Sequence, residues 1–310
     1  HSHHPALTRM RPHPPADETI MSLLSVSDLG LTLAEPLFTG LAFTLHPGDR
    51  VGLVAANGRG KSSLLRVIAG LSDATQGSVT RARGARVALV EQDPPAALLD
   101  LSLRDAVLEG LPQEARDYDG WRVDVALDDL SVPGDLRDRP LRALSGGWQR
   151  TALLARAAVG EPDLYLLDEP TNHLDLARIG VLTRWLAALP RATGVLTVSH
   201  DRAFLDGATT RTLFLRQADS RDFALPFSAA RAALAEADAA DARVFGNRMK
   251  EAQQLRRQAA KLKNIGINSG SDLLTVKTRQ LSERADRIEA AARPAHRERS
   301  AGAIRLDGSA

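Results

Sequence analysis

The sequence predicts an α/β fold built around a parallel sheet, followed by a separate helical hairpin. Short runs that are apolar throughout, such as residues 164–168 and 195–199, alternate with helical patterns, which is typical of strands buried on both faces. A glycine-rich loop at residues 55–63 stands between a predicted strand and a predicted helix. After about residue 215 the pattern changes to residues rich in Ala, Arg, Lys, Glu and Gln, which predicts helices.

The composition limits the class of protein. Of the 310 residues, 44% are hydrophobic and 25% are charged, as expected for a globular protein, and the length suggests one large domain with an appendage or two domains. The chain contains no cysteine, which excludes disulfides, thiol catalysis and thiolate metal sites and fits a cytoplasmic location. Apolar runs stay well below the roughly 20 residues that span a bilayer, so we expect no membrane insertion.

The elements of the first part follow in order. Residues 1–20 are rich in His and Pro and predict a disordered leader, with Met21 as the functional start. Two β-like runs are separated by the turn Pro47-Gly48-Asp49. Residues 96–143 are predicted to be mostly helical, with breaks at Pro112, Gly120, Pro133 and Gly134. The other predicted elements are helices at 64–71, 148–159 and 176–188 and strands at 85–92, 164–168 and 195–199.

Two long helical stretches, residues 228–263 and 273–292, follow this part. The sequence from Asn264-Ile265-Gly266 through Ser269-Gly270 predicts a break between them, and two helices around a short loop form an antiparallel hairpin. We therefore expect a leader at 1–20, a first domain at 21–220 with a helical subdomain at about 94–160, a basic hairpin linker at 221–295 and an open linker at 296–310.

The glycine-rich loop predicts a phosphate site. Its second half matches the pattern G-x-x-x-x-G-K-[ST], in which backbone N–H groups at a helix N-terminus bind phosphate oxygens. Lys61 is expected to reach the β- and γ-phosphates of ATP, and the Ser62 hydroxyl to ligate Mg²⁺. Ala55 replaces the first glycine, so either this position has ordinary dihedral angles or the loop is slightly strained. The predicted loop residues are Ala55, Ala56, Asn57, Gly58, Arg59, Gly60, Lys61, Ser62 and Ser63.

Two carboxylates, Asp168 and Glu169, end the apolar run at residues 164–168. A strand ending in this way delivers them to the edge of the sheet where the phosphates lie. Asp168 is predicted to hold Mg²⁺, directly or through water, and Glu169 to polarise the water that attacks the γ-phosphate. Strands often end in acidic residues, so this pair alone is a weak signal. It indicates a nucleotide site because a phosphate loop precedes it in the chain.

The segment Leu144-Ser145-Gly146-Gly147-Trp148-Gln149-Arg150 predicts a second anion site. Ser145 can cap the following helix, while Gly146 and Gly147 leave N–H groups exposed at its positive end. An ordinary serine-capped helix is the alternative. The segment resembles the signature motif of ATP-binding cassette proteins, and the resemblance covers about residues 22–215. It implies that Ser145, Gly146 and Gly147 close over the γ-phosphate of ATP held by a partner cassette.

The resemblance implies roles for four further residues. Gln92 resembles the glutamine that senses Mg²⁺ and the attacking water, and His200 the switch histidine that contacts the γ-phosphate. Asp175 resembles the aspartate that couples the two sites across the dimer. Leu33 stands near the first strand, where cassettes usually stack an aromatic residue on adenine, so apolar contact would have to substitute. The implied catalytic residues are Glu169, His200 and Gln92, and the implied metal ligands are Ser62, Gln92 and Asp168.

The segments 169–175 (EPTNHLD) and 199–206 (SHDRAFLD) resemble the ABC-F family, whose members carry two cassettes joined by a helical linker and have no membrane domain. Many act on the ribosome, so the resemblance implies a translation or antibiotic-resistance factor whose residues 228–292 meet rRNA or tRNA. Residues 243–299 hold 14 basic and 6 acidic side chains, which suits an RNA backbone. A solvated spacer, the energising subunit of a membrane transporter and a DNA-associated ATPase remain alternatives.

The chain contains a single set of these motifs. The resemblance implies that each composite site takes Lys61, Asp168 and Glu169 from one cassette and Ser145 with Gly147 from another. We therefore expect either a truncated two-cassette protein or a chain that dimerises through ATP.

Overall fold

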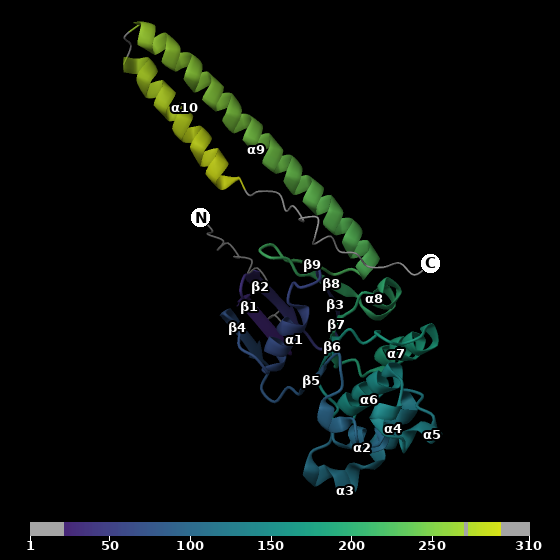
Figure 1. Ribbon diagram of the computed structural model, residues 1–310. Helices are drawn as coiled ribbons and strands as arrows, with labels where there is room; N and C mark the ends of the chain where they lie inside the picture. The colour runs from purple at the N-terminus through teal and green to yellow at the C-terminus, as the bar shows by residue number, and fades with distance from the viewer. Residues whose placement is uncertain (1–21, 270–271, 293–310) are drawn as a thin grey trace, which may run out of the picture.

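The globular body of the chain, residues 22–226, contains two sheets and a helical region, and a hairpin of two long helices extends from it (Figure 1). The computed structural model describes residues 22–269 and 272–292. The predicted leader and the predicted open linker lie outside the described residues. Among the described helices, none combines the length and the apolar character needed to cross a bilayer.

A three-stranded antiparallel sheet with the order β2-β1-β4 forms one side of the body. In the central strand, Val26 pairs with Phe43 on one side and with Val79 on the other. Apolar residues of β1 and β2 are buried in a core that also contains the first helix, and β2 includes the β-like run predicted before the turn at Pro47. These strands are β1 (Leu24–Thr32), β2 (Pro36–Leu45) and β4 (Gln76–Arg81).

A six-stranded sheet with the order β5-β6-β7-β3-β8-β9 runs through the body. The strands from β5 to β8 pair in parallel, and β9 pairs antiparallel with β8. Every residue of β6 and of β7 is buried, so both faces of the sheet are covered and the predicted α/β fold is confirmed. The strands are β3 (Arg50–Val54), β5 (Val87–Val90), β6 (Leu164–Asp168), β7 (Gly194–Val198), β8 (Arg211–Phe214) and β9 (Arg221–Phe223).

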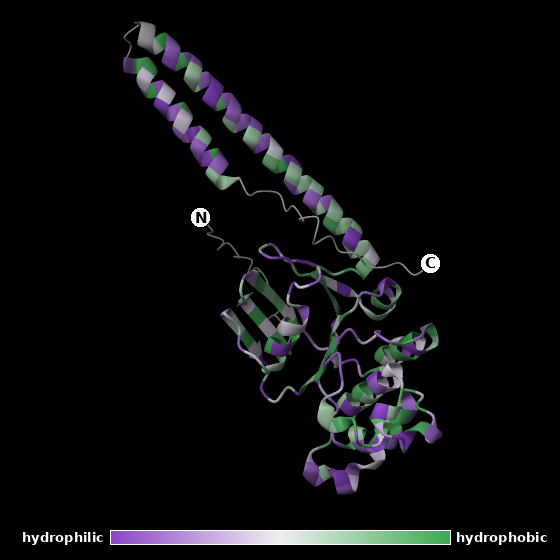
Figure 2. Cartoon of the chain, viewed as in Figure 1, coloured by the Kyte–Doolittle hydropathy of each residue, from purple (hydrophilic) through white to green (hydrophobic). Residues whose placement is uncertain are grey.

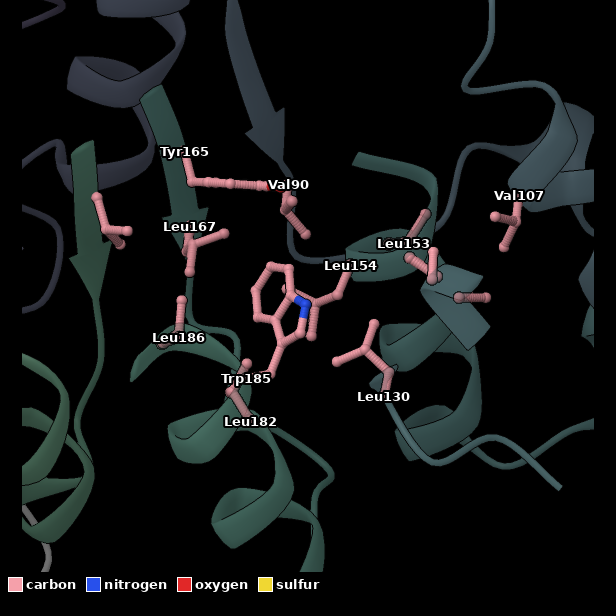
Figure 3. Close-up of a cluster of buried hydrophobic side chains, with 14 of the residues drawn as sticks. Val90, Val107, Leu130, Leu153, Leu154, Tyr165, Leu167, Leu182, Trp185 and Leu186 are labelled. Atoms are coloured by element: carbon pink, nitrogen blue, oxygen red, sulfur yellow. The ribbon is translucent and has the colours of Figure 1, made fainter. Parts of the chain in front are cut away.

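Successive side chains of β6 point to opposite faces of the sheet and belong to two separate hydrophobic cores. Leu164 and Leu166 pack on the face that bears α1, whereas Tyr165 and Leu167 pack on the face that bears α6 and α7. Figure 3 shows this second core, in which Trp185 approaches Tyr165 edge-on at 5.4 Å between ring centroids. The covering helices are α1 (Lys61–Ala69), α6 (Gly146–Ala158), α7 (Leu176–Ala188) and α8 (Arg202–Ala208).

The region between β5 and α6 consists of short helices, as predicted for residues 96–143. Its chain breaks fall where expected, because Pro112 and Pro133 precede helical turns and Gly120 separates α3 from α4. Val107 and Leu130 pack beside Leu153 and Leu154 of α6 (Figure 3). The elements are α2 (Leu103–Leu108), α3 (Arg116–Asp119), α4 (Trp121–Asp129), α5 (Gly134–Arg137) and 3₁₀ turns at Ala96–Leu98, Gln113–Ala115 and Leu141–Ala143.

Three of the predicted boundaries that differ from the structure bear on the loop and strand ends near the parallel sheet. Helix α1 begins at Lys61 rather than at residue 64, because the left-handed Gly60 caps it directly from the phosphate loop. Helix α6 begins at Gly146 rather than at residue 148, directly after the extended Ser145. Strand β5 ends at Val90, so Gln92 lies two residues beyond the strand and not at its end.

The hairpin consists of α9 (Phe227–Ser269) and α10 (Asp272–Ala291), which confirms the predicted antiparallel pair. The break predicted from Asn264-Ile265-Gly266 through Ser269-Gly270 starts too early, since α9 continues to Ser269. One glycine costs a helix only about 1 kcal/mol, which a helix of this length tolerates. Figure 2 shows hydrophilic residues along most of both helices. Small side chains and ion pairs join them, including Arg256 with Asp286 at 2.9 Å and with Glu289 at 2.7 Å.

The first turns of α9 belong to the core of the body. Phe227, Ala230 and Leu234 are buried there, and Phe227 packs against Phe214 with 6.4 Å between ring centroids. The hairpin is therefore anchored by apolar packing at its base and not only by its connection to the chain.

Replacing Phe227 by Ala is expected to destabilise the chain by about 3–5 kcal/mol, because the truncation leaves a cavity at the base of α9. Chemical denaturation followed by circular dichroism measures this change. The matched control is Leu273→Ala, since Leu273 is 78% exposed and its loss should change the unfolding free energy by less than about 0.5 kcal/mol. Equal effects of the two substitutions would contradict the anchoring of α9.

Candidate nucleotide-binding site

The phosphate loop, residues 55–60, joins β3 to α1 at the carboxyl edge of the parallel strands. Gly58 and Gly60 have φ angles of 73° and 83°, which favour glycine. A Cβ atom on Gly60 would lie 2.8 Å from Cδ1 of Leu37, which is the end of a flexible side chain, so the positive φ is the main reason for glycine at this position. The backbone N–H groups at the start of α1 are thereby presented to an anion.

Ala55, which replaces the first glycine of the pattern, is buried and does not have a positive φ. The sequence left two alternatives for Ala55, ordinary dihedral angles or a slightly strained loop. The structure has the first, so the backbone at Ala55 is not strained. Its carbonyl oxygen accepts a hydrogen bond of 3.2 Å from Nζ of Lys61. That bond holds the ammonium group over the loop.

Asp168 is the last residue of β6, and Glu169 follows it; both are buried. Asp168 pairs in register with Val198 at the end of β7. Glu169 has a φ of 48°, an uncommon conformation for a residue other than glycine, and its N–H donates to the carbonyl of Val198 at 2.9 Å. This turn brings the Glu169 carboxylate to the end of β7.

His200, two residues beyond β7, lies against Glu169. Its backbone N–H donates to Oε2 of Glu169 at 3.2 Å, and its Nε2 lies 3.1 Å from Oε1. A buried pair of hydroxyl groups, Thr171 and Ser199 at 2.8 Å, joins the same two chain segments. The structure therefore brings the predicted general base and the predicted switch histidine into direct contact.

Lys61 interacts electrostatically with both carboxylates. Burial raises the pKa of Glu169, and the positive charge of Lys61 opposes this rise. Burial lowers the pKa of Lys61, and the charges of Glu169 and Asp168 oppose this fall. The predicted phosphate ligand, metal ligand and base therefore form one cluster.

The raised pKa of Glu169 predicts a pH-dependent stability. The folded chain holds this proton more tightly than the unfolded chain, so the contribution of Glu169 is fully present below its ordinary pKa of 4.5 and is lost as pH rises through the raised pKa. Glu169→Gln removes this loss. Urea denaturation at a series of pH values should show the variant gaining stability over the wild type across that window. A difference that is constant with pH would contradict the burial of a charged Glu169.

The signature segment begins α6. Ser145 is the N-cap residue with an extended backbone, but its side chain makes no capping hydrogen bond, so the predicted serine cap is wrong. Ser145 and Gly146 are exposed at the positive end of this 13-residue helix. A Cβ atom on Gly147 would lie 2.8 Å from the carbonyl oxygen of His173, so glycine is needed where α6 meets the chain after Glu169. The exposed end of α6 can therefore accept an anion from another molecule.

Asp175 and Arg178 connect this segment to α7. Asp175 caps α7 by accepting from the N–H of Arg178 at 2.8 Å. The Arg178 guanidinium lies 3.0 Å from the centroid of the Trp148 ring and donates to the Thr151 hydroxyl at 2.8 Å. The N-terminal ends of α6 and α7 are thus held together.

Arg150 is a neighbour of the carboxylates to which the sequence assigned no role. It is 2% exposed and donates to the carbonyl oxygen of Glu91. Burial lowers its pKa, and Asp93, Asp168 and Glu169 oppose the shift. The helical spacing from Gly147 to Arg150, Thr151 and Leu154 places these residues on one buried face, which is the signal that could have identified it.

Ser62, Gln92 and Leu33 are exposed. The Ser62 hydroxyl, in the first turn of α1, and the Asp168 carboxylate are the hard oxygen ligands that Mg²⁺ prefers, so the residues present fit this cation. The Gln92 side chain is exposed, and it forms no hydrogen bond with another residue in the described part of the chain. Leu33 is 68% exposed in the turn between β1 and β2. Among the described residues, neither side chain forms a hydrogen bond or ion pair with Asp168 or Glu169.

Comparison with known proteins agrees with this geometry. Residues 38–172 match the family model described as "ABC transporter". The chain is 36% identical over 201 residues to the energy-dependent translational throttle protein EttA of Mycobacterium tuberculosis, covering 54% of this chain and 35% of that protein. It is 40% identical over 214 residues to the ATP-binding protein Uup of Caulobacter vibrioides, covering 68% of this chain and 33% of that protein. The chain thus spans about a third of the length of these relatives.

Solved structures share the fold of the globular body. A metal-chelate type ABC transporter in an inward-facing conformation is 30% identical with a TM-score of 0.58, covering 66% of this chain and 83% of that one. An ATP-binding cassette solved as a dimer with ADP and phosphate in a post-hydrolysis state has a TM-score of 0.57 at 20% identity, covering 64% and 97%. The chain therefore belongs to the ATP-binding cassette ATPases, and its similarity to EttA and Uup confirms its resemblance to the ABC-F type.

Proposed function

We propose that this chain binds Mg-ATP between its own phosphate loop and the signature segment of a second cassette, and that closure around ATP positions the hairpin on a ribosome. Lys61 and the loop N–H groups would bind the phosphates, and Ser62 and Asp168 would hold Mg²⁺, which neutralises charge on the phosphates. Glu169 would accept the proton of the water that attacks the γ-phosphorus, giving ADP and phosphate. His200 and Gln92 would contact the γ-phosphate and the water.

In this proposal the second cassette supplies the signature segment that closes over the ATP bound by this chain. The exposed Ser145 and Gly146, at the positive end of α6, support a role in binding the γ-phosphate held by another cassette. The partner is either a second cassette in a longer chain or a second copy of this chain.

The hairpin is the observation that favours a ribosomal role over transport. A basic arm anchored in the cassette core has no evident use in a subunit that energises a membrane protein. One relative is named as a translational throttle, which supports the same role. The exposed basic side chains near the far end of the hairpin suit an RNA backbone; they are Arg257, Lys261, Lys263, Lys277 and Arg279.

Co-sedimentation with ribosomes tests this proposal. The Glu169→Gln variant should pellet with ribosomes in the presence of ATP, resist moderate salt and remain in the supernatant without nucleotide. Changing Arg257, Lys261 and Lys263 to Ala should weaken pelleting and lower the slope of its salt dependence by up to about one per removed phosphate contact. The matched control removes three exposed arginines of the body, Arg83, Arg184 and Arg191, and should pellet as before.

Other outcomes lead to different conclusions. Pelleting that ignores nucleotide and disappears with salt would reduce the hairpin to a basic segment that binds RNA nonspecifically. A lack of pelleting, repeated with a second cassette supplied, would refute the ribosomal role and favour a transporter or a DNA partner.

A further inference from the structure

The base of the hairpin has no capping side chain of its own. Helix α9 begins at Phe227 and is preceded by Pro226, whose side chain offers no acceptor for the N–H groups of the first turn. The acceptor comes from another element. Asp206 accepts from the Ser228 N–H at 2.7 Å and also from the Ser228 hydroxyl. A carboxylate at a helix N-terminus is favourable for the helix dipole as well.

Asp206 stands on α8, the helix that begins directly after His200 and Asp201. Asp201 caps α8 by accepting from the Phe204 N–H at 2.9 Å. Phe204 and Leu205 are buried in the core, so they hold α8 as one packed unit. One end of this seven-residue helix therefore follows the histidine at the nucleotide site, and its other end holds the first turn of α9.

A chain of contacts links His200 to Lys61 of the phosphate loop. His200 contacts Glu169 through two atoms, and Glu169 interacts electrostatically with Lys61 of the phosphate loop. A γ-phosphate entering between these groups would compete with the contact between His200 and Glu169. Because α8 begins two residues after His200, a shift of His200 would reach the start of this helix.

A second attachment gives α9 a pivot. Arg216, which is 8% exposed, forms a two-pronged ion pair with Asp238, with a distance of 2.8 Å from Nη1 to Oδ1. Asp238 lies ten residues beyond Ser228, and Ser269 lies thirty-one residues further along α9. If α9 turned as a rigid rod about this ion pair, at about 1.5 Å per residue, a displacement at Ser228 would be magnified roughly threefold at the end of α9.

We propose that Asp206 is a positioning residue that couples the nucleotide site to the hairpin, so that the contact between His200 and Glu169 sets the direction of α9. This inference rests on one part of the proposed function, namely that His200 contacts the γ-phosphate of bound ATP. It requires neither a ribosome nor hydrolysis.

The test measures the direction of the hairpin with and without a nonhydrolysable ATP analogue. Because the chain contains no cysteine, cysteines introduced at Gln258 on α9 and Ser78 on β4 take spin labels selectively. The label-to-label distance, measured by pulsed electron resonance, should shift when the analogue with Mg²⁺ binds. Asp206→Ala should bind the analogue within about twofold of the wild-type affinity but lose the shift. Asp206→Asn, which keeps an acceptor for the Ser228 N–H, should retain it.

A further variant separates coupling from stability. Adding Pro226→Asp to Asp206→Ala gives α9 a cap of its own, which should restore the melting temperature without restoring the distance shift. A shift that survives in Asp206→Ala, or returns with the new cap, would overturn the coupling. So would a wild type that binds the analogue without any shift. An Asp206-dependent shift in a chain that does not pellet with ribosomes would refute the proposed ribosomal role alone, and a wild type that binds no analogue would refute both.

Discussion

The Glu169→Gln variant is expected to hydrolyse ATP about 10²- to 10⁴-fold more slowly than the wild type while it still binds ATP. Glutamine has the same shape and keeps an oxygen that can accept the His200 N–H, as Oε2 of Glu169 does at 3.2 Å. It cannot accept a proton from the attacking water. The left-handed backbone at residue 169, with its φ of 48°, is retained because neither side chain is branched at Cβ.

Phosphate release in single-turnover conditions measures this effect, with a second cassette supplied where the chain alone turns over too slowly. Glu161→Gln is the matched control, because Glu161 also has a positive φ, of 44°, but lies at the opposite end of β6. The control should hydrolyse ATP at the wild-type rate. A Glu169→Gln variant with the same rate would show that another group accepts the proton.

Replacing Lys61 by Ala is expected to weaken ATP binding by about 10- to 150-fold. Hydrogen bonds to a charged group contribute about 1.5–3 kcal/mol, and each 1.4 kcal/mol changes affinity tenfold. The substitution also removes the positive charge that opposes the raised pKa of Glu169, so this pKa should rise further. Without nucleotide, the two buried carboxylates then lack this compensating cation.

Equilibrium titration with a fluorescent ATP analogue measures the loss of affinity. The control, Lys250→Ala, removes an equal charge from an exposed position on α9 and should leave the affinity unchanged. If Lys61→Ala bound ATP as tightly as the wild type, the loop at residues 55–60 would not be the phosphate site.

Strands and helices that are specified by their own residues could be predicted closely from the sequence. The run at residues 164–168 became β6 and the pattern at 176–188 became α7, with the predicted ends. These succeeded because an uninterrupted apolar run and an aspartate cap are local signals. The break predicted from Asn264 started too early because the cost of one glycine is small beside the propagation of a long helix. The cap by Ser145 failed because hydroxyl orientation depends on surroundings that the sequence does not specify.

By itself the sequence determined the chemistry of this chain: a loop that can bind phosphate, two carboxylates at a strand end and a signature segment that begins a helix. These depend on residue types at short spacings, which local backbone geometry converts directly into structure. Only the tertiary structure decided which distant groups meet. The contact of His200 with Glu169, the burial of Arg150 beside Asp93 and the capping of α9 by Asp206 join residues from separate elements. Such contacts depend on strand order, register and helix packing, and these arise from burial of the whole core.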